Sequence, residues 1–292
     1  MSAPLTGLVV AAHGRQYRVE LPDGETLLCY TRGKKSEVVC GDRVQVQGTG
    51  EGQGVIDLVE PRHSLLYRSN EIRQKLIAAN VDQLILVVAT EPAFSELLVS
   101  RCLIAADSQG IAPLIVLNKS DLEERLGPAR QRLATLIQLG YPVLELSARQ
   151  GAAPLLPHLQ GKTSVLVGQS GMGKSTLINA LIPEARAATR EISAALDSGK
   201  HTTTHATLYH LDRDSHIIDS PGLQEFGLGH LDQGDLEQAF PEFAPYLGQC
   251  RFRNCQHQQE PGCALQAAAA AGHIHPERLQ LFTTLARETR RG

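Results

Sequence analysis

The sequence lacks the features that would place a chain in or across a membrane. No stretch approaches the roughly 18 consecutive apolar residues that a membrane-spanning helix needs. The first residues, Met1-Ser2-Ala3-Pro4-Leu5, lack the basic start and the apolar run of a secretory signal peptide. Hydrophobic residues make up 42% of the chain, which is typical of a folded protein. We therefore expect a globular protein that works in the cytoplasm.

The chain also lacks a strong excess of charge of either sign, and it has six cysteines. Its 28 basic and 31 acidic residues give a net charge of −3. Such a balance offers no general attraction to nucleic acid, so an RNA partner must be inferred from other features. Three of the six cysteines fall between residues 250 and 263. In a reducing compartment this crowding indicates a metal site rather than disulfides.

The first 64 residues contain five short runs with strand character, separated by turn signals such as Pro22-Asp23-Gly24. Such a series of short strands predicts a small barrel. We favour an OB fold, and an SH3-like barrel is the main alternative. The expected strands are Leu5–Ala11, Tyr17–Leu21, Glu25–Tyr30, Arg43–Gln47 and Gly54–Val59.

Beyond the barrel, apolar strands alternate with helical stretches over residues 65–228. This alternation predicts parallel strands with helices on both faces, with any ligand at the carboxyl ends of the strands. Residues 229–292 are predicted to be mostly helical around the cysteine cluster, and 185–201 to form a mobile loop. We therefore expect a multi-domain α/β protein with a barrel (1–64), a central α/β domain (65–228) and a helical metal-binding domain (229–292).

A phosphate-binding loop is predicted at Gly168-Gln169-Ser170-Gly171-Met172-Gly173-Lys174-Ser175, which fits G-x-x-x-x-G-K-[ST] between a strand and a helix. Backbone N–H groups from Ser170 to Ser175 can surround phosphates because the glycines let the backbone approach closely. Lys174 would neutralise the β and γ oxygens, Ser175 would ligate Mg²⁺, and Thr176 after it would belong to the GTP-binding residues. The alternative is a glycine-rich turn that binds no ligand.

A guanine-selective motif is predicted at Asn118-Lys119-Ser120-Asp121. The Asp121 carboxylate can accept from both N1–H and the N2 amine of guanine, a pair that adenine does not offer. Asn118 would support the loop and the base edge, and the aliphatic stem of Lys119 would cover the ring face. Ser147-Ala148 would close the pocket, with a backbone N–H directed at the guanine O6.

The order of these motifs is unusual. The base-reading motif precedes the phosphate loop, and Asp219-Ser220-Pro221-Gly222 comes last. Common GTPases run from the phosphate loop through Asp-x-x-Gly to Asn-Lys-x-Asp, so the domain is predicted to be circularly permuted. Asp219 would hold Mg²⁺ through water, and the N–H of Gly222 would meet the γ-phosphate. In the alternative interpretation Ser220-Pro221-Gly222 is an ordinary turn.

The catalytic group is harder to assign from the sequence. Thr202-Thr203-Thr204 occupies the place of a first switch, and we favour Thr204 as a Mg²⁺ ligand; the threonines could instead begin a strand. Leu223 stands where a water-orienting glutamine is expected, and Gln224 follows it. His201 is our candidate catalytic residue, although a loop histidine is often merely solvated. We expect slow intrinsic turnover that a partner accelerates.

A structural zinc site is predicted in the C-terminal part. Cys250, Cys255, His257 and Cys263 offer three thiolates and one imidazole within 14 residues. These four ligands would complete a tetrahedral Zn²⁺ site and leave no position open for water. The alternative is a set of buried free thiols. A zinc-dependent nucleic-acid enzyme would instead need an open metal position.

Taken together, these residues resemble the bacterial small ribosomal subunit-dependent GTPase A family, which are circularly permuted GTPases of ribosome assembly. The likeness covers nearly the whole chain and includes Gly199-x-His201-Thr202-Thr203-Thr204 and Glu260-Pro261-Gly262-Cys263. The resemblance implies an OB domain, a permuted GTPase and a zinc domain. It also implies binding to 16S rRNA, a late role in 30S maturation, subunit-stimulated GTP hydrolysis, and a catalytic role for His201.

We therefore expect a monomeric GTPase that binds GTP with Mg²⁺ and one structural Zn²⁺. It would dock on the 30S subunit, alone or with other assembly factors, and would couple hydrolysis to release. The competing hypothesis is a GTP-gated RNA-binding or ribosome-binding scaffold in which hydrolysis is incidental, which the leucine at position 223 favours.

Overall fold

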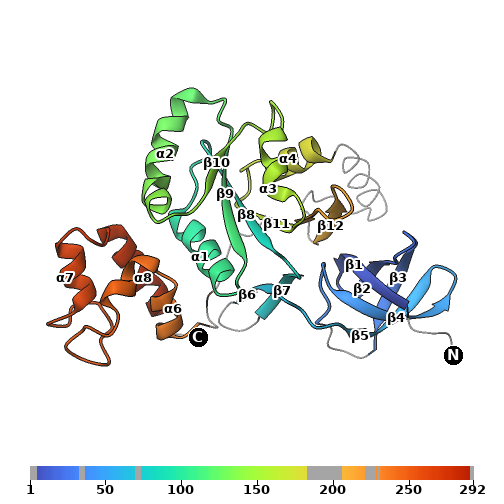
Figure 1. Cartoon of the computed structure of the whole chain (residues 1–292), viewed down its shortest axis with the longest axis horizontal. Coiled ribbons are helices and arrows are strands. Elements are labelled where there is room, and N and C mark those ends of the chain that lie inside the picture. Colours follow the sequence, from blue (N-terminus) through green and yellow to red (C-terminus); the bar gives the residue numbers. More distant parts are fainter. Residues whose placement is uncertain are drawn as a thin grey trace.

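Three structural units follow one another along the chain in the computed structural model (Figure 1). A β-barrel lies at one end, an α/β unit in the middle and a group of short helices at the other end. The structure describes residues 5–32, 37–69, 74–182, 206–220, 228 and 231–289. Some residues singled out in the sequence fall outside these ranges, namely the expected loop 185–201, His201, Thr202, Thr203, Thr204, Gly222, Leu223 and Gln224.

The N-terminal strands close a barrel in the order β1-β2-β3-β5-β4, with β4 returning to β1. Strands β3 and β5 are parallel, and the other neighbours are antiparallel. The expectation of an OB-type barrel of five strands is confirmed. Alternate inward side chains, among them Val9, Tyr17 and Val44, fill its core. The strands are β1 (Leu5–His13), β2 (Gln16–Glu20), β3 (Thr26–Thr31), β4 (Arg43–Gly50) and β5 (Gln53–Val59).

The α/β unit is built on five parallel strands in the order β10-β9-β8-β11-β13. Every residue of the central strand β8 is buried, as a parallel strand covered on both faces requires. Strand β9, which ends at Asn118 of the base-reading motif, precedes β11, which ends directly before the phosphate loop. Both strands belong to the same parallel sheet, so the permuted order of the motifs is confirmed within one domain. The elements are β8 (Gln83–Ala89), α1 (Glu96–Asp107), β9 (Ala112–Asn118), α2 (Glu123–Gln138), β10 (Val143–Glu145), η1 (Ala153–Leu155), α3 (Leu156–Leu159), β11 (Thr163–Val167), α4 (Lys174–Leu181) and β13 (His216–Asp219).

Strand β12 (Thr207–His210) departs from the parallel arrangement that the alternating pattern predicts. It is antiparallel to β13, because the short connection over 211–215 can only reverse the chain, whereas a parallel pair needs a long crossover. On its other side β12 is antiparallel to β1, where Ala11 pairs with Thr207. The barrel and the α/β unit therefore share one continuous 11-stranded sheet.

A hairpin that the sequence analysis did not predict links the barrel to the central sheet. Its strands are β6 (Leu65–Ser69) and β7 (Gln74–Ala79). The N–H of Ala79 donates to the Cys40 carbonyl at 3.0 Å, and Asn80 Nδ2 donates to the Gly41 carbonyl at 2.9 Å. The hairpin thus fixes the barrel loop around Gly41 against the α/β unit.

The C-terminal unit is built from helices α6 (Gln233–Gln238), η2 (Pro241–Tyr246), α7 (Ala264–Ala270) and α8 (Pro276–Thr289). Phe240, Phe243 and Phe282 form a fully buried aromatic cluster with ring centroids 4.9 to 5.5 Å apart. Throughout the described part of the chain, no helix combines the length and apolar character needed to cross a membrane.

Candidate functional site

The sequence motifs meet at one edge of the sheet because each follows the carboxyl end of a parallel strand. Strand β9 ends at Asn118, which pairs with Ala89 of β8. Strand β11 ends at Val167, directly before the phosphate loop. Asp219 closes β13 beside Leu166. Segments that lie far apart in the sequence are therefore brought to one site, as parallel topology predicts.

Asn118 holds three of these segments together. Its Nδ2 donates to the Met172 carbonyl in the phosphate loop at 2.9 Å. Its Oδ1 accepts from the backbone N–H of Ala148 at 2.9 Å and of Lys119 at 2.8 Å. The side chain is buried, so these bonds are shielded from water. Asn118 thus also fixes the position of Ala148, whose N–H is the group expected from the sequence to face the guanine O6.

Lys119 adds a second connection to the phosphate loop. Its Nζ donates to the carbonyls of Gly171 at 2.8 Å and Glu91 at 2.6 Å. Its backbone has a φ of 61°, in the left-handed region that a non-glycine residue seldom adopts. This conformation is consistent with a side chain that is held in place for a specific task.

The carboxylate of Asp121 carries a polar atom with no partner. Asp121 Oδ1 and Ser147 Oγ are buried and form no hydrogen bond of acceptable geometry with the described residues. The nearby Ser147 hydroxyl is nevertheless the largest influence that holds the pKa of Asp121 below its ordinary value. The N–H of Ser120 donates to the Leu146 carbonyl at 3.2 Å, which joins the two loops. A ligand with adjacent N–H donors, such as guanine, fits the unpartnered oxygen of the Asp121 carboxylate.

Two glycines of the phosphate loop are required by its geometry. Gly168 has a φ of 149°, and a Cβ there would lie 2.3 Å from the Val87 carbonyl oxygen. Gly173 has a φ of 91°, and a Cβ there would lie 2.3 Å from Asn118 Nδ2. Any side chain at either position would displace the loop. Two hydroxyl residues follow the loop in the first turn of α4. These residues, Ser175 and Thr176, are both exposed, so their hydroxyls are accessible at the start of the helix.

Lys174 and Asp219 form the charged part of the site. Lys174 Nζ donates to the carbonyls of Gly168 at 2.6 Å and Gln169 at 2.9 Å. Burial lowers the pKa of Lys174, and the charge of Asp219 opposes this. Burial raises the pKa of Asp219 to about 6, and Lys174 opposes that shift. A phosphate with a divalent cation would supply partners for both buried charges.

The four residues of the expected metal site converge in the C-terminal unit. The ligand atoms of Cys250, Cys255, His257 and Cys263 all lie within 4.8 Å of one another. His257 Nδ1 is 3.5 Å from Cys250 Sγ and 3.3 Å from Cys263 Sγ. Tetrahedral zinc with Zn–S bonds of about 2.3 Å gives separations of this order. This cluster can therefore hold a zinc ion.

Glu237 is an outer partner of this cluster. Its Oε1 lies 3.1 Å from His257 Nε2 and accepts from Gln233 Nε2 at 2.7 Å. An imidazole that donates Nε2–H to a carboxylate keeps Nδ1 free as a metal ligand. The cluster thus has both the donor set and the supporting acceptor of a zinc site.

Sequence reasoning named Gln169 as part of the phosphate loop but missed the contacts that connect the site to its surroundings. Gln169 Oε1 accepts from the N–H of Ser95 at 2.7 Å, across 74 residues of sequence. Glu237 and Glu91 were missed as well. Neither gave a sequence signal, because a helical glutamate and a backbone carbonyl are common everywhere. The expected roles of His201, Thr204 and Gly222 concern residues outside the described ranges.

Comparison with known proteins identifies the family. A model of the RsgA GTPase family matches residues 59–229. A Small ribosomal subunit biogenesis GTPase RsgA from Ralstonia pickettii is 55% identical over 97% of this chain and 92% of that protein. One from Nitrosomonas europaea is 54% identical over 96% and 90%.

Two solved structures share the whole architecture. YjeQ from Thermotoga maritima has a TM-score of 0.74 and 30% identity, over 99% of both chains. YloQ, described as a circularly permuted GTPase, has a TM-score of 0.70 and 26% identity, over 99% of this chain and 96% of YloQ. The similarity in sequence and structure extends over all three units, and it agrees with the nucleotide motifs gathered at the sheet edge. This chain therefore belongs to the RsgA GTPase family and is a GTP-hydrolysing enzyme.

Proposed function

We propose that this GTPase binds the small (30S) ribosomal subunit in the cytoplasm and assists its late maturation. Intrinsic hydrolysis is slow, the subunit stimulates it, and hydrolysis is coupled to release. One observation carries the proposal. The base-reading segment and the phosphate loop are joined through Asn118, in a chain 55% identical to a relative named for small-subunit biogenesis. The partners are GTP and GDP, the subunit with its 16S rRNA, and other assembly factors bound to it.

In this proposal Asp121 binds the guanine base. The buried carboxylate oxygen Asp121 Oδ1, which has no partner among the described residues, supports this assignment. Asn118 and Lys119 hold the base-reading loop against the phosphate loop. Lys174 contacts the β- and γ-phosphates, because its amine is already directed along the loop toward the Gly168 and Gln169 carbonyls.

Mg²⁺ is assigned to Ser175 and to Asp219 through water, with Thr204 as the third ligand. The exposed position of Ser175 at the start of α4 and the burial of Asp219 beside Lys174 support the first two. Gly222 is assigned to the γ-phosphate and His201 to the orientation of the attacking water. One structural Zn²⁺ per chain is assigned to Cys250, Cys255, His257 and Cys263, where it would hold together a segment with a small core.

The loop between the first two cysteines of the metal cluster is a suitable RNA-contacting surface. Phe252 is 43% exposed, and the Arg251 guanidinium lies 5.4 Å from its ring centroid. Within the described ranges, Arg251 and Arg253 form no ion pair with a carboxylate. An exposed aromatic ring flanked by two arginines without carboxylate partners can stack on an unpaired base while the arginines contact phosphates. This loop therefore offers the local positive charge that the overall balance of −3 lacks.

The test compares GTP hydrolysis with and without purified 30S subunits. We expect stimulation of the parent protein, loss of turnover in Lys174→Ala, and reduced stimulation in His201→Ala with unchanged GTP affinity. Phe252→Ala should weaken sedimentation with the subunit while GTP affinity stays constant. A parent enzyme that the subunit does not stimulate would favour the GTP-gated scaffold, and full stimulation of His201→Ala would remove the catalytic role of that residue.

A further inference from the structure

The phosphate loop supports the start of helix α1. The backbone N–H of Ser95, the residue that caps this helix, donates to Gln169 Oε1 at 2.7 Å. Ser95 Oγ in turn accepts from the N–H of Leu98 at 3.3 Å. A phosphate-loop side chain therefore fixes the point from which α1 begins.

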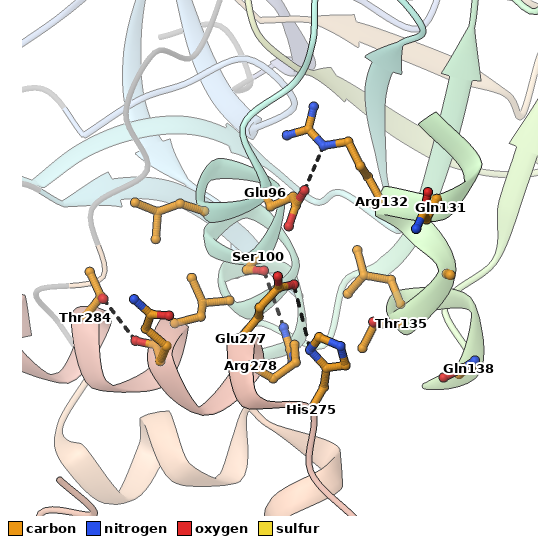
Figure 2. A pocket seen from close by; sticks show the side chains of 15 residues that line it. Glu96, Ser100, Gln131, Arg132, Thr135, Gln138, His275, Glu277, Arg278 and Thr284 are labelled. Atoms are coloured by element: carbon orange, nitrogen blue, oxygen red, sulfur yellow. Dashed lines mark hydrogen bonds and ion pairs between the residues drawn. The ribbon is translucent and has the colours of Figure 1, made fainter. Parts of the chain in front are cut away.

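Helix α2 holds the same point from another side. Arg132 Nη2 donates to the Phe94 carbonyl at 2.7 Å, and Nε donates to Glu96 Oε1 at 2.7 Å. Its guanidinium also lies over the Phe94 ring, 4.6 Å from the centroid. Figure 2 shows Arg132 and Glu96 joined above the first turn of α1. The position of α1 is thus set jointly by α2 and by the phosphate loop.

The C-terminal unit docks on α1 through Arg278 of α8. Arg278 Nη1 donates to Ser100 Oγ at 3.4 Å, and Figure 2 shows the two side chains side by side. Arg278 also pairs with Glu242 at 2.6 Å, with both side chains only 8% exposed, and it lies over Phe240 at 4.4 Å. Glu288, farther along α8, pairs with Arg101 of α1. Two successive residues of α1 therefore anchor α8.

Helix α1 is well suited to connect these two contacts. Ser95 and Ser100 are five residues apart, which is about 7.5 Å along a helix. The helix contains no glycine or proline, and eight of its twelve residues are buried. A rigid, packed element of this kind moves as a unit, so a change at Ser100 reaches Ser95.

The groove in Figure 2 separates α8 from α2 at this junction. Residues of α1, α2 and α8 line this cavity of about 690 Å³. Its charged groups are already paired, as Arg132 with Glu96 and Arg278 with Glu242. Helix α8 contacts α1 through Arg278, and the groove beside this contact leaves part of the α2 surface uncovered. Arg278 and Glu288 of the C-terminal unit thus reach the site through α1.

We propose that Arg278 is a positioning residue for the GTP site, acting through Ser100, helix α1 and the Ser95–Gln169 hydrogen bond. The inference rests on the proposed assignment of the phosphate loop to GTP. When Arg278 holds α1, Gln169 has a fixed partner and the phosphate loop keeps its shape. By reciprocity, nucleotide bound in the loop strengthens docking of the C-terminal unit. A partner that binds this unit thereby gains a route to the phosphates through helix α1.

A double-mutant cycle tests this connection. The affinity for a fluorescent GTP analogue, KM and kcat are measured for Gln169→Ala, Arg278→Gln and the double variant. We expect each single change to weaken binding of the GTP analogue by about fivefold or more, and the effect on turnover should appear mainly as a higher KM. The double variant should bind no more weakly than the weaker-binding of the two single variants. Effects at independent sites would multiply, so a multiplicative result in folded, zinc-loaded protein would overturn the proposal.

Two further variants separate positioning from a general loss of structure. Ser100→Ala removes the contact but leaves Arg278 paired with Glu242, and it should reproduce the KM effect of Arg278→Gln. Arg287→Gln is the matched control, because Arg287 lies on the same helix and contacts Gln258 rather than α1. It should leave KM unchanged. An unchanged KM in Ser100→Ala would contradict the proposal even if Arg278→Gln fails to fold.

The outcome also distinguishes this inference from the assignment of the site. If Lys174→Ala abolishes binding of the analogue while Arg278→Gln and Ser100→Ala retain full affinity, the GTP site stands and the positioning role is wrong. If the parent protein does not bind the analogue, both are wrong.

Discussion

The Asn118 side chain donates to the Met172 carbonyl across 54 residues of sequence and accepts from the Ala148 N–H across another 30. Both bonds measure 2.9 Å and lie in the interior. One amide therefore sets the distance between the segment assigned to guanine and the loop assigned to the phosphates. Gly173 leaves the room that this amide occupies.

Asn118→Ala should weaken GTP and GDP binding by roughly 30-fold or more. The change leaves a buried carbonyl and a buried N–H without partners, which costs about 1–3 kcal/mol for each group. Calorimetric titration of both nucleotides measures the effect. Asn254→Ala, at an exposed position in the loop between the metal-binding cysteines, is the control and should bind normally. Equal affinities in the two variants would contradict the joining role of Asn118.

Asp219→Asn should stabilise the protein when nucleotide and Mg²⁺ are absent. Burial raises the pKa of Asp219 from an ordinary value of 3.8 to about 6. The favourable contribution of this carboxyl to folding is complete below about pH 4 and is lost as the pH rises through 6. At pH 7 the ionised group costs up to about 3 kcal/mol, which the amide avoids.

Urea unfolding at pH 7 and at pH 5, in the presence of a chelator, checks this prediction. The stability difference between Asp219→Asn and the parent should be larger at pH 7 than at pH 5. The same variant should bind GTP less tightly when Mg²⁺ is present, because a neutral amide attracts the hydrated cation less. A difference in unfolding free energy that does not change with pH would show that burial of Asp219 carries no such cost.

Glu237→Gln should lower zinc affinity by about 10- to 100-fold, because the carboxylate orients His257 and increases its basicity. Competition with a chromogenic chelator measures the affinity, and circular dichroism follows loss of the C-terminal helices. Glu277→Gln provides the control, since the Glu277 side chain is 76% exposed and lies 3.8 Å from His275 rather than near the cluster. Zinc affinity that is the same in both variants would exclude a supporting role for Glu237.

Gly41→Ala should destabilise the protein far more than Gly24→Ala, although both glycines have a positive φ, of 91° and 88°. A Cβ at Gly41 would lie 2.2 Å from the Ala79 carbonyl oxygen, whereas a Cβ at Gly24 meets nothing within 4 Å. Backbone strain costs about 1–2 kcal/mol in each case, and the clash is added only at Gly41. Thermal unfolding of the two variants isolates the clash, and similar losses would show that the barrel loop adjusts freely.

Local patterns predicted much of this protein. The OB-type barrel, the permuted order and the cysteine–histidine cluster each depend on residues close in sequence or on the rule that parallel strands share one ligand edge. Two contacts that hold the barrel to the α/β unit were not predicted, because each joins segments that are distant in the chain. Strand β12 pairs with β1 of the barrel, and the end of the 65–79 hairpin bonds to the barrel loop around Gly41. Neither contact leaves a periodic signal in either segment.

The sequence by itself indicated the chemistry, because the motifs assigned to phosphate and guanine and the four candidate zinc ligands are recognisable from residue types at fixed spacing. Tertiary structure alone decided which groups support that chemistry. Asn118 reaches Met172, Gln169 reaches Ser95, and Glu237 reaches His257 only because strands and helices distant in the chain pack side by side. Such contacts depend on the relative position of whole elements, which the packing of the core sets and no short stretch of sequence encodes.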